Sequence, residues 1–167
     1  MFSPFFPPSS RPSPAMSTSS RPPTDLRVKI GSSFDIVTAR QLGRQLAGEL
    51  GLADAEVTLL VAAISEVARN IVDHARRGEV LFNVIENGVK RGLQIVARDD
   101  GPGIPDVERA MQYGYSTAGG LGVGLPGAKW LMDEFAIDST VGQGTRVTMC
   151  KWSKSASPAA APLVAAV

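Results

Sequence analysis

Glu66 and Asn70 are the first residues whose types and spacing could do chemistry. They stand four positions apart in a stretch with helical spacing of apolar residues, so both side chains are expected on one helix face. A carboxylate beside a carboxamide can supply one proton acceptor and one oxygen ligand for a hard cation such as Mg²⁺. A solvated polar helix face gives the same pattern, so this pair alone does not decide between the two interpretations.

The second motif, residues 99–104, reads Asp-Asp-Gly-Pro-Gly-Ile and directly follows a predicted strand. Its first carboxylate, Asp99, can accept a hydrogen bond from an exocyclic amine such as that of adenine. Gly101 and Gly103 have no side chain, which lets the backbone pass close to a flat ligand. The same residues are good turn formers, so a plain turn and a ligand-binding loop are both compatible with this motif.

A glycine-rich segment, residues 119–127, runs into a predicted helix and contains Gly120, Gly122 and Gly124. Unpaired N–H groups and the positive end of the helix dipole at such a junction can bind phosphate. The segment also shows the spacing G-x-G-x-x-G, but no strand precedes it and no βαβ unit surrounds it, so a Rossmann site is not indicated. The P-loop pattern with Gly-Lys-Ser/Thr is absent from the sequence.

The elements that must position these motifs follow from the periodicity of apolar residues and from the turn residues between them. The order β-α-α-β-β-α-α-β-β predicts an α+β fold, a two-layer α/β sandwich with a mixed, mostly antiparallel sheet and helices on one face. We expect strands at residues 26–30, 79–85, 93–98, 135–139 and 145–152, and helices at residues 35–50, 54–75, 105–112 and 126–134.

The amino-acid composition excludes several classes of protein as interpretations of this sequence. The 167 residues carry a formal net charge of +1, and residues 25–152 hold fourteen basic and sixteen acidic residues, so the basic excess of a nucleic-acid binder is missing. One Cys and one His exclude an internal disulfide and argue against a structural zinc site. The apolar run at residues 59–64 is far shorter than the ~20 residues that span a bilayer. We expect a soluble, cytoplasmic protein with no membrane partner.

The two ends differ in composition from the middle. Residues 1–24 contain seven of the twelve prolines and no acidic residue, which predicts a disordered Pro/Ser-rich leader, with Met16 as an alternative start. Residues 153–167 are rich in Ala and Pro, and we expect a disordered tail there. The predicted domain therefore covers residues 25–152.

Four segments together resemble a known family. In order along the chain they are similar to the N, G1, G2 and G3 boxes of the GHKL ATPases, a superfamily that includes the ATPase domains of gyrase, heat-shock chaperones, histidine kinases and mismatch-repair proteins. Within it the chain looks most like the small serine/threonine switch kinases of stressosome and anti-sigma-factor pathways. The resemblance covers residues 26–152 and implies the Bergerat ATP-binding fold. The four segments are residues 66–70, 99–103, 120–124 and 142–145.

The resemblance implies a role for each matching residue at the base end of an ATP site. Asp99 would bind the adenine amine, Gly101 and Gly103 would lie beside the base, and Thr145 would support it through water. Residues 104–119 would form a short lid over the nucleotide.

At the phosphate end the resemblance implies that Asn70 coordinates Mg²⁺ and that Glu66 is the general base or an orienting group for the attacking hydroxyl. Gly120, Gly122 and Gly124 would give backbone N–H groups to the phosphates. ATP and Mg²⁺ are thus the implied cofactors.

The same resemblance implies transfer of the γ-phosphate to a Ser or Thr of a STAS-domain antagonist. A second hypothesis is an ATP-binding partner switch that sequesters a sigma factor or activates a phosphatase with little catalysis. A third, the catalytic domain of a histidine kinase, is disfavoured because the chain has no length left for a dimerisation domain. Many relatives of the anti-sigma type dimerise, so a homodimer is compatible with the sequence.

Three residues near these motifs are expected to have other roles. His74 lies one turn beyond Asn70, and we expect a structural or rim position for it. Arg69 could steady the γ-phosphate or face a partner, although a surface role is the simpler interpretation. Cys150, in the last predicted strand, is expected to be a small buried apolar residue.

Overall fold

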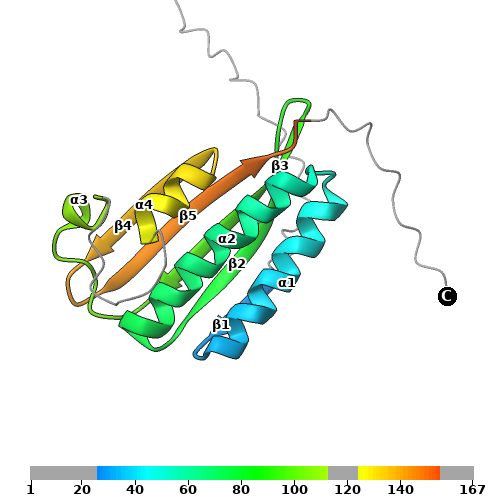
Figure 1. The fold of residues 1–167 in the computed structure, drawn as a ribbon. Coiled ribbons are helices and arrows are strands. Elements are labelled where there is room, and N and C mark those ends of the chain that lie inside the picture. Colours follow the sequence, from blue (N-terminus) through cyan, green and yellow to red (C-terminus); the bar gives the residue numbers. More distant parts are fainter. Residues whose placement is uncertain (1–25, 113–123, 155–167) are drawn as a thin grey trace, which may run out of the picture.

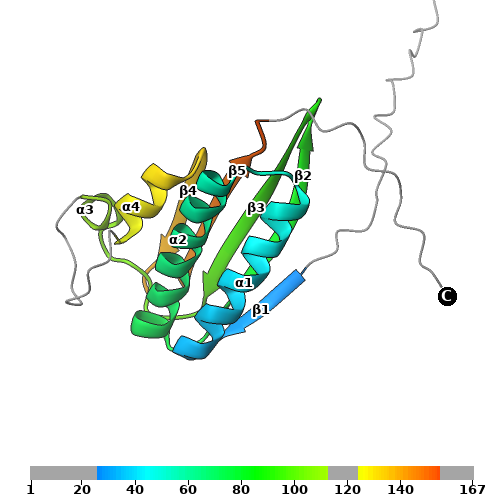
Figure 2. The ribbon, with the colours of Figure 1, turned by 45° about the vertical axis from the view of Figure 1, so that its right-hand side comes forward.

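The computed structural model describes residues 26–112 and 124–154, which form one antiparallel sheet with helices packed on one of its faces (Figure 1). The strand order is β1-β2-β3-β5-β4. Both ribbon views show α1, α2 and α4 side by side over the same face, with α3 at the outer edge (Figure 2). The elements are β1 (Leu26–Ile30), α1 (Ser33–Glu49), α2 (Asp54–Asn70), the π-helical turn η1 (Ile71–Ala75), β2 (Gly78–Asn87), β3 (Lys90–Asp99), α3 (Val107–Ala110), α4 (Gly124–Leu131), β4 (Glu134–Thr140) and β5 (Gly144–Trp152).

The predicted fold class is confirmed, although several elements differ in detail, among them the helix expected at residues 105–112, which is a single turn at Val107–Ala110. Every strand pair in the described sheet is antiparallel, whereas the sequence suggested a mixed sheet. The long helix expected to reach residue 75 changes to π-helical winding at Ile71. The helix expected at residues 126–134 ends at Leu131, because Glu134 already belongs to β4. Within the described ranges, no helix is long and apolar enough to cross a membrane.

The hydrophobic core lies between the sheet and the helices. Leu60 and Ile64 of α2 are fully buried against Phe82 of β2 and Ile95 of β3. Gly43 of α1 faces Ile64, and a Cβ at that position would overlap the Ile64 side chain, so the glycine sets how closely the two helices approach. Each large side chain buried here contributes about 1.5–3 kcal/mol to stability. This packing fixes α2 over the middle of the sheet.

A group of polar contacts holds the end of α4 against β5. Lys151 donates to the Leu131 carbonyl at 3.2 Å and to Asp133 at 3.0 Å, and Asp133 also accepts from the backbone N–H of Trp152 at 2.8 Å. Burial acts to raise the pKa of Asp133, but the hydrogen bonds from Trp152 and Lys151 outweigh it and hold that pKa below its ordinary value. Contacts continue past the predicted end of the domain, since Ser153 is buried and its N–H donates to the Arg91 carbonyl at 2.8 Å.

The turn between β4 and β5 is packed against the segment that follows β3. Gly142 and Gly144 both have positive φ, +77° and +102°. A Cβ on Gly144 would overlap the carbonyl oxygen of Asp99, whereas a Cβ on Gly142 would meet nothing within 4 Å. The Gly142 N–H donates to the Pro102 carbonyl at 2.8 Å, which ties the turn to the loop after Asp99.

We predict that Gly144→Ala destabilises the protein by about 3 kcal/mol, because a left-handed φ and a backbone overlap are penalised together. Gly142→Ala is the matched control: it carries the φ penalty alone and should lower the free energy of unfolding by only about 1 kcal/mol. Urea denaturation of both variants measures the difference. Equal losses would mean that the contact between Gly144 and Asp99 does not constrain the fold.

Candidate functional site

Three polar side chains lie in one row across the sheet. Ser139 of β4 pairs in register with Thr145 of β5, and Thr145 pairs with Asp99 of β3. The row continues through Gly78 to Ile30, which is buried in the core. Directly opposite residues of antiparallel strands project to the same face, so all three polar side chains belong to the helix-covered face of the sheet.

Asp99 is half-buried, and its side chain is held by the turn that follows it. Its Oδ1 accepts from the Gly101 N–H at 2.9 Å, whereas Oδ2 makes no hydrogen bond to any described residue. A Cβ on Gly101 would come within 2.5 Å of the Ala75 Cβ and 2.9 Å of Asp99 Oδ1, so no side chain fits there. One carboxylate oxygen thus fixes the loop and the other remains available to a ligand.

Gly103 allows the next part of this loop to touch β4. Its φ is +72°, and a Cβ would overlap the Thr140 carbonyl. One residue further, the Ile104 N–H donates to Ser139 Oγ at 2.8 Å. Residues 99–104 are therefore held on one side by β4 and on the other by Ala75, beyond the end of α2.

The end of α2 reaches the same end of the sheet. Ile71 lies over Gly78, where an added Cβ would be 2.8 Å from Ile71 Cγ2. The π-helical turn that begins at Ile71 ends at Arg76, which has a left-handed φ of 67°. π-helical turns are frequent at functional sites. This close packing places Asn70, the residue before Ile71, near the end of β3.

Glu66 and Asn70 are both half-buried, and neither forms a hydrogen bond or ion pair with a described residue. They stand one helical turn apart near the C-terminal end of α2. Arg69, between them in sequence, is exposed, as is His74. A half-buried carboxylate and carboxamide without partners in the described part of the chain leave their polar atoms free for a ligand, and their predicted roles stay predictions.

The structure brings most of the predicted site residues to one end of the sheet. Gly124 is the first residue of α4, which packs beside α2. Gly120 and Gly122, and most of the expected lid, lie outside the residues that the structure describes. No group of three or more His, Cys, Asp or Glu residues in the described ranges could hold a metal ion. The predicted residues at the end of α2, in the sheet and in the loop after β3 are Glu66, Asn70, Asp99, Gly101, Gly103 and Thr145.

Sequence reasoning missed Ser139. Its Oγ accepts from Ile104, lies 2.8 Å from Thr145 Oγ1 and lies 3.1 Å from the Gly144 carbonyl oxygen. The sequence marked it only as the last residue of a predicted strand. The register of the hairpin could have identified it, because a tight turn before Thr145 puts a residue of the preceding strand directly opposite that threonine.

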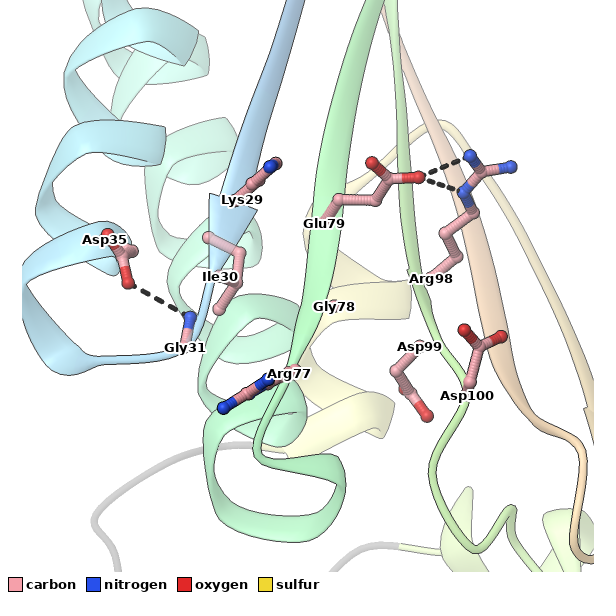
Figure 3. Close-up of a pocket in the computed structure, with 10 residues that line it drawn as sticks. All are labelled: Lys29, Ile30, Gly31, Asp35, Arg77, Gly78, Glu79, Arg98, Asp99 and Asp100. Atoms are coloured by element: carbon pink, nitrogen blue, oxygen red, sulfur yellow. Dashed lines mark hydrogen bonds and ion pairs between the residues drawn. The ribbon is translucent and has the colours of Figure 1, made fainter.

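A hollow lined mainly by charged side chains borders this row at Asp99 (Figure 3). Lys29, Glu79 and Arg98 project into it from the face that the helices leave uncovered, and Glu79 pairs with Arg98. Figure 3 shows Asp99 pointing away from Arg98, as expected for neighbours in a strand. The hollow shares Ile30, Gly78 and Asp99 with the row, but its lining includes no residue of α2 and neither hydroxyl of the row.

The sequence of this chain matches the model of a known protein family. The model of the histidine kinase-like ATPase domain matches residues 34–151, which include α2, the loop after β3 and the β4–β5 turn. The chain belongs to this family. The resemblance expected from the four sequence segments is confirmed.

Relatives within the histidine kinase-like ATPases include kinases and anti-sigma factors. The chain is 49% identical over 125 residues to the serine/threonine-protein kinase RsbT of Bacillus subtilis (strain 168), covering 75% of this chain and 94% of that kinase. It is 30% identical over 120 residues to the anti-sigma F factor of Thermoanaerobacter sp. (strain X514), covering 68% of this chain and 82% of that factor. The crystal structure of the RsbU and RsbW domains of Rv1364c from Mycobacterium tuberculosis has the same fold, with a TM-score of 0.53 and 20% identity over 78% of this chain and 32% of that one.

We predict that Asp99→Asn weakens ATP binding at least about tenfold. The asparagine oxygen can still accept from the Gly101 N–H, which leaves its NH₂ group facing the amine of adenine, donor against donor. Asp100→Asn is the matched control, since Asp100 is the neighbouring exposed carboxylate. Calorimetric titration with Mg-ATP should show a loss for the first variant and parent-like affinity for the second. Unchanged affinity in Asp99→Asn would contradict the assignment of Asp99 to the base.

Proposed function

We propose that this chain is an ATP-dependent serine/threonine protein kinase of a partner-switching pathway, which transfers the γ-phosphate of ATP to a Ser or Thr of a STAS-domain regulator. The observation that carries the proposal is the half-buried carboxylate of Glu66, without a partner among the described residues and one turn before Asn70. The similarity to the kinase RsbT over almost its whole length supports the same conclusion.

The row across the sheet would bind the base. Oδ2 of Asp99 is available to accept from the adenine amine, and Thr145 lies next to it on β5. Gly101 and Gly103 keep side chains out of the loop that would line the base. The hydrogen bonds that tie the loop to β4 and to the β4–β5 turn support this role, because a loop held in place would need little ordering when a ligand binds.

The end of α2 would bind the phosphates. In nucleotide sites Mg²⁺ is usually held by phosphate oxygens, waters and one or two protein oxygens. The amide oxygen of Asn70 fits such a site, and the absence of a larger acidic cluster among the described residues is compatible with it. When bound, the ion neutralises charge on the phosphates. Gly120, Gly122 and Gly124 are proposed to donate backbone N–H groups to them.

Glu66 would then act on the acceptor hydroxyl. Phosphoryl transfer needs positioning and charge neutralisation, together with a group that orients the attacking hydroxyl and takes its proton. The Glu66 carboxylate forms no ion pair with the described residues that would occupy it. We propose that it accepts the proton as the hydroxyl oxygen attacks the γ-phosphorus and ADP leaves.

A second candidate function is an ATP-dependent partner switch that sequesters a sigma factor or activates a phosphatase with little catalysis. The anti-sigma F factors among the relatives favour it. A switch of this kind requires nucleotide binding but no proton acceptor beside the γ-phosphate. The role of Glu66 therefore separates the two candidates.

We predict that Glu66→Gln lowers phosphate transfer by about 10²–10⁴-fold and leaves ATP affinity unchanged, because general-base catalysis contributes about that much. Transfer is measured as acid-stable label on a purified STAS-domain protein incubated with γ-labelled ATP and Mg²⁺. Asp73→Asn, which neutralises an exposed carboxylate in the π-helical turn, is the control and should retain activity.

Equal turnover by parent and Glu66→Gln would exclude Glu66 as the base. Absence of transfer by the parent, together with a complex that forms only with ATP, would favour the partner switch. Acid-labile label on the protein itself would indicate histidine chemistry instead.

We also propose that the kinase domain begins at residue 25 and extends to Ser153, one residue beyond the predicted end, and that residues 1–24 are not required for it. A variant that lacks residues 1–24 should keep the melting temperature and ATP affinity of the full chain, because β1 begins at Leu26. Thermal denaturation and calorimetry test this. A marked loss of either quantity would mean that the leader belongs to the fold.

A further inference from the structure

We propose that Asn87 is a site of spontaneous deamidation, at which the backbone nitrogen of Gly88 displaces ammonia from the side-chain amide and water then opens the ring to aspartate or isoaspartate. The site is the tip of the β2–β3 hairpin, and its chemistry does not depend on the proposed kinase activity. Three features of the tip lead to this inference: its backbone pairing, the open surroundings of Gly88 and the exposed side chain of Asn87.

The end of the β2–β3 hairpin is a ribbon of two strands. Among the described residues, β1 pairs with β2 only as far as Phe82, and β5 pairs with β3 only from Gly92 onward. Residues 86–90 lie beyond both limits, and the last tie on the β5 side is the hydrogen bond from Ser153 to the Arg91 carbonyl. Both ribbon views show this end projecting past β1, α1 and α2 (Figures 1 and 2). Two strands alone are marginally stable in water, so the tip opens more readily than the middle of the sheet.

Gly88 offers a backbone nitrogen that can reach the side-chain amide. It is the first residue of the turn, and its N–H donates to no described residue. Its φ is +61°, and an added Cβ would meet nothing within 4 Å, so the space around it is open. Glycine also has no side chain to hinder attack by its nitrogen. The Gly88 nitrogen can therefore approach Cγ of Asn87.

The side chain of Asn87 is free to turn toward that nitrogen. Asn87 is exposed, and its amide makes no hydrogen bond to any described residue. Asparagine is one of the chemically labile residues of proteins. An exposed turn also gives water access to both the amide and the ring that would form from it.

The reaction balances with water as its co-reactant. The Gly88 nitrogen loses its proton and bonds to Cγ of Asn87, and the side-chain nitrogen takes up a proton and leaves as ammonia. Water then adds to one of the two carbonyl carbons of the five-membered succinimide and breaks the bond from that carbon to the ring nitrogen. Cleavage at Cγ gives aspartate, and cleavage at the backbone carbon gives isoaspartate. Either product lowers the formal net charge of the chain from +1 to 0.

Comparable positions elsewhere in the chain lack one of these features. The other asparagines, Asn70 and Asn83, precede β-branched residues, whose side chains crowd the attacking nitrogen. Asp100 precedes a glycine and could form the same ring by losing water, but the Gly101 N–H donates to Asp99 Oδ1 at 2.9 Å. The modification is therefore expected at Asn87 and not at these positions.

The hairpin tip lies at the opposite end of the sheet from the candidate site. Gly78 at the start of β2 pairs with Asp99, whereas Asn87 at its end pairs with Lys90. At about 3.3 Å per strand residue, roughly 30 Å separate the two ends. The modified protein should therefore bind ATP as the parent does.

The test is storage of the purified full chain at mildly alkaline pH, which speeds loss of the proton from the attacking nitrogen. Ion-exchange chromatography should show loss of the original form and growth of a more acidic one. Peptide mapping by mass spectrometry should locate aspartate and isoaspartate at residue 87, with Asn70 and Asn83 intact. Methylation by a protein isoaspartate methyltransferase identifies the isoaspartate.

Variants separate this chemistry from other sources of an acidic form. Asn87→Gln would need a six-membered ring and should remain in its original form under the same conditions. Gly88→Ala places a Cβ beside the nitrogen and should slow the loss, but alanine in a left-handed conformation costs about 1–2 kcal/mol, so Asn87→Gln is the decisive variant. Asn83→Gln is the matched control and should lose its original form at the rate of the parent.

An acidic form in which Asn87 is intact, or one that grows equally fast in Asn87→Gln, overturns the inference. The chain unfolded in urea gives a second criterion. If the unfolded chain deamidates at residue 87 while the folded chain stays unchanged over the same time, the folded turn keeps the amide and the nitrogen apart and the inference fails. Failure of the parent to bind ATP would bear on the proposed function alone.

Discussion

The structure depends most on how closely three backbone segments approach one another around Asp99. Gly144 contacts the Asp99 carbonyl, Gly101 contacts Ala75, and Gly78 lies under Ile71. A side chain at any of these glycines would separate the sheet from the end of α2 or from the β4–β5 turn. The position of the candidate site therefore depends on glycine at these three positions as much as on the side chains that surround them.

Much of this arrangement could be predicted from the sequence, because periodicity and turn residues reveal elements and their order. The helix carrying Glu66 and Asn70 and the strand before Asp99 were both expected where they lie. The winding change at Ile71 could not be predicted, since no Pro or Gly interrupts that stretch. The turn brings Ala75 against the backbone of Gly101, a tertiary contact that local sequence does not reveal.

The residue types of the site could be predicted from the sequence, but the contacts between those residues could not. Asp99 and Thr145 were each expected near the base, but nothing in their sequence positions shows that they face each other across two strands. Ser139 was missed because a serine at a strand end is common and its importance depends entirely on register. The hydrogen bond from Ile104, thirty-five positions away, is likewise visible only in three dimensions.

The two ends of the site are built differently, and this difference bears on how a kinase and a binding switch could share one fold. At the base end, hydrogen bonds from Gly101, Ile104 and Gly142 hold the loop to its neighbours. At the phosphate end, Glu66 and Asn70 project from α2 without described partners. In the proposed site, recognition of the base would require little reorganisation, whereas the two polar side chains of α2, which have no partner among the described residues, would be bound by the ligand. A protein that lost the carboxylate of Glu66 would keep every contact of the base end. If Glu66 is the base, as proposed, catalysis could be lost from this fold without loss of nucleotide binding, and a single carboxylate would distinguish the two functions.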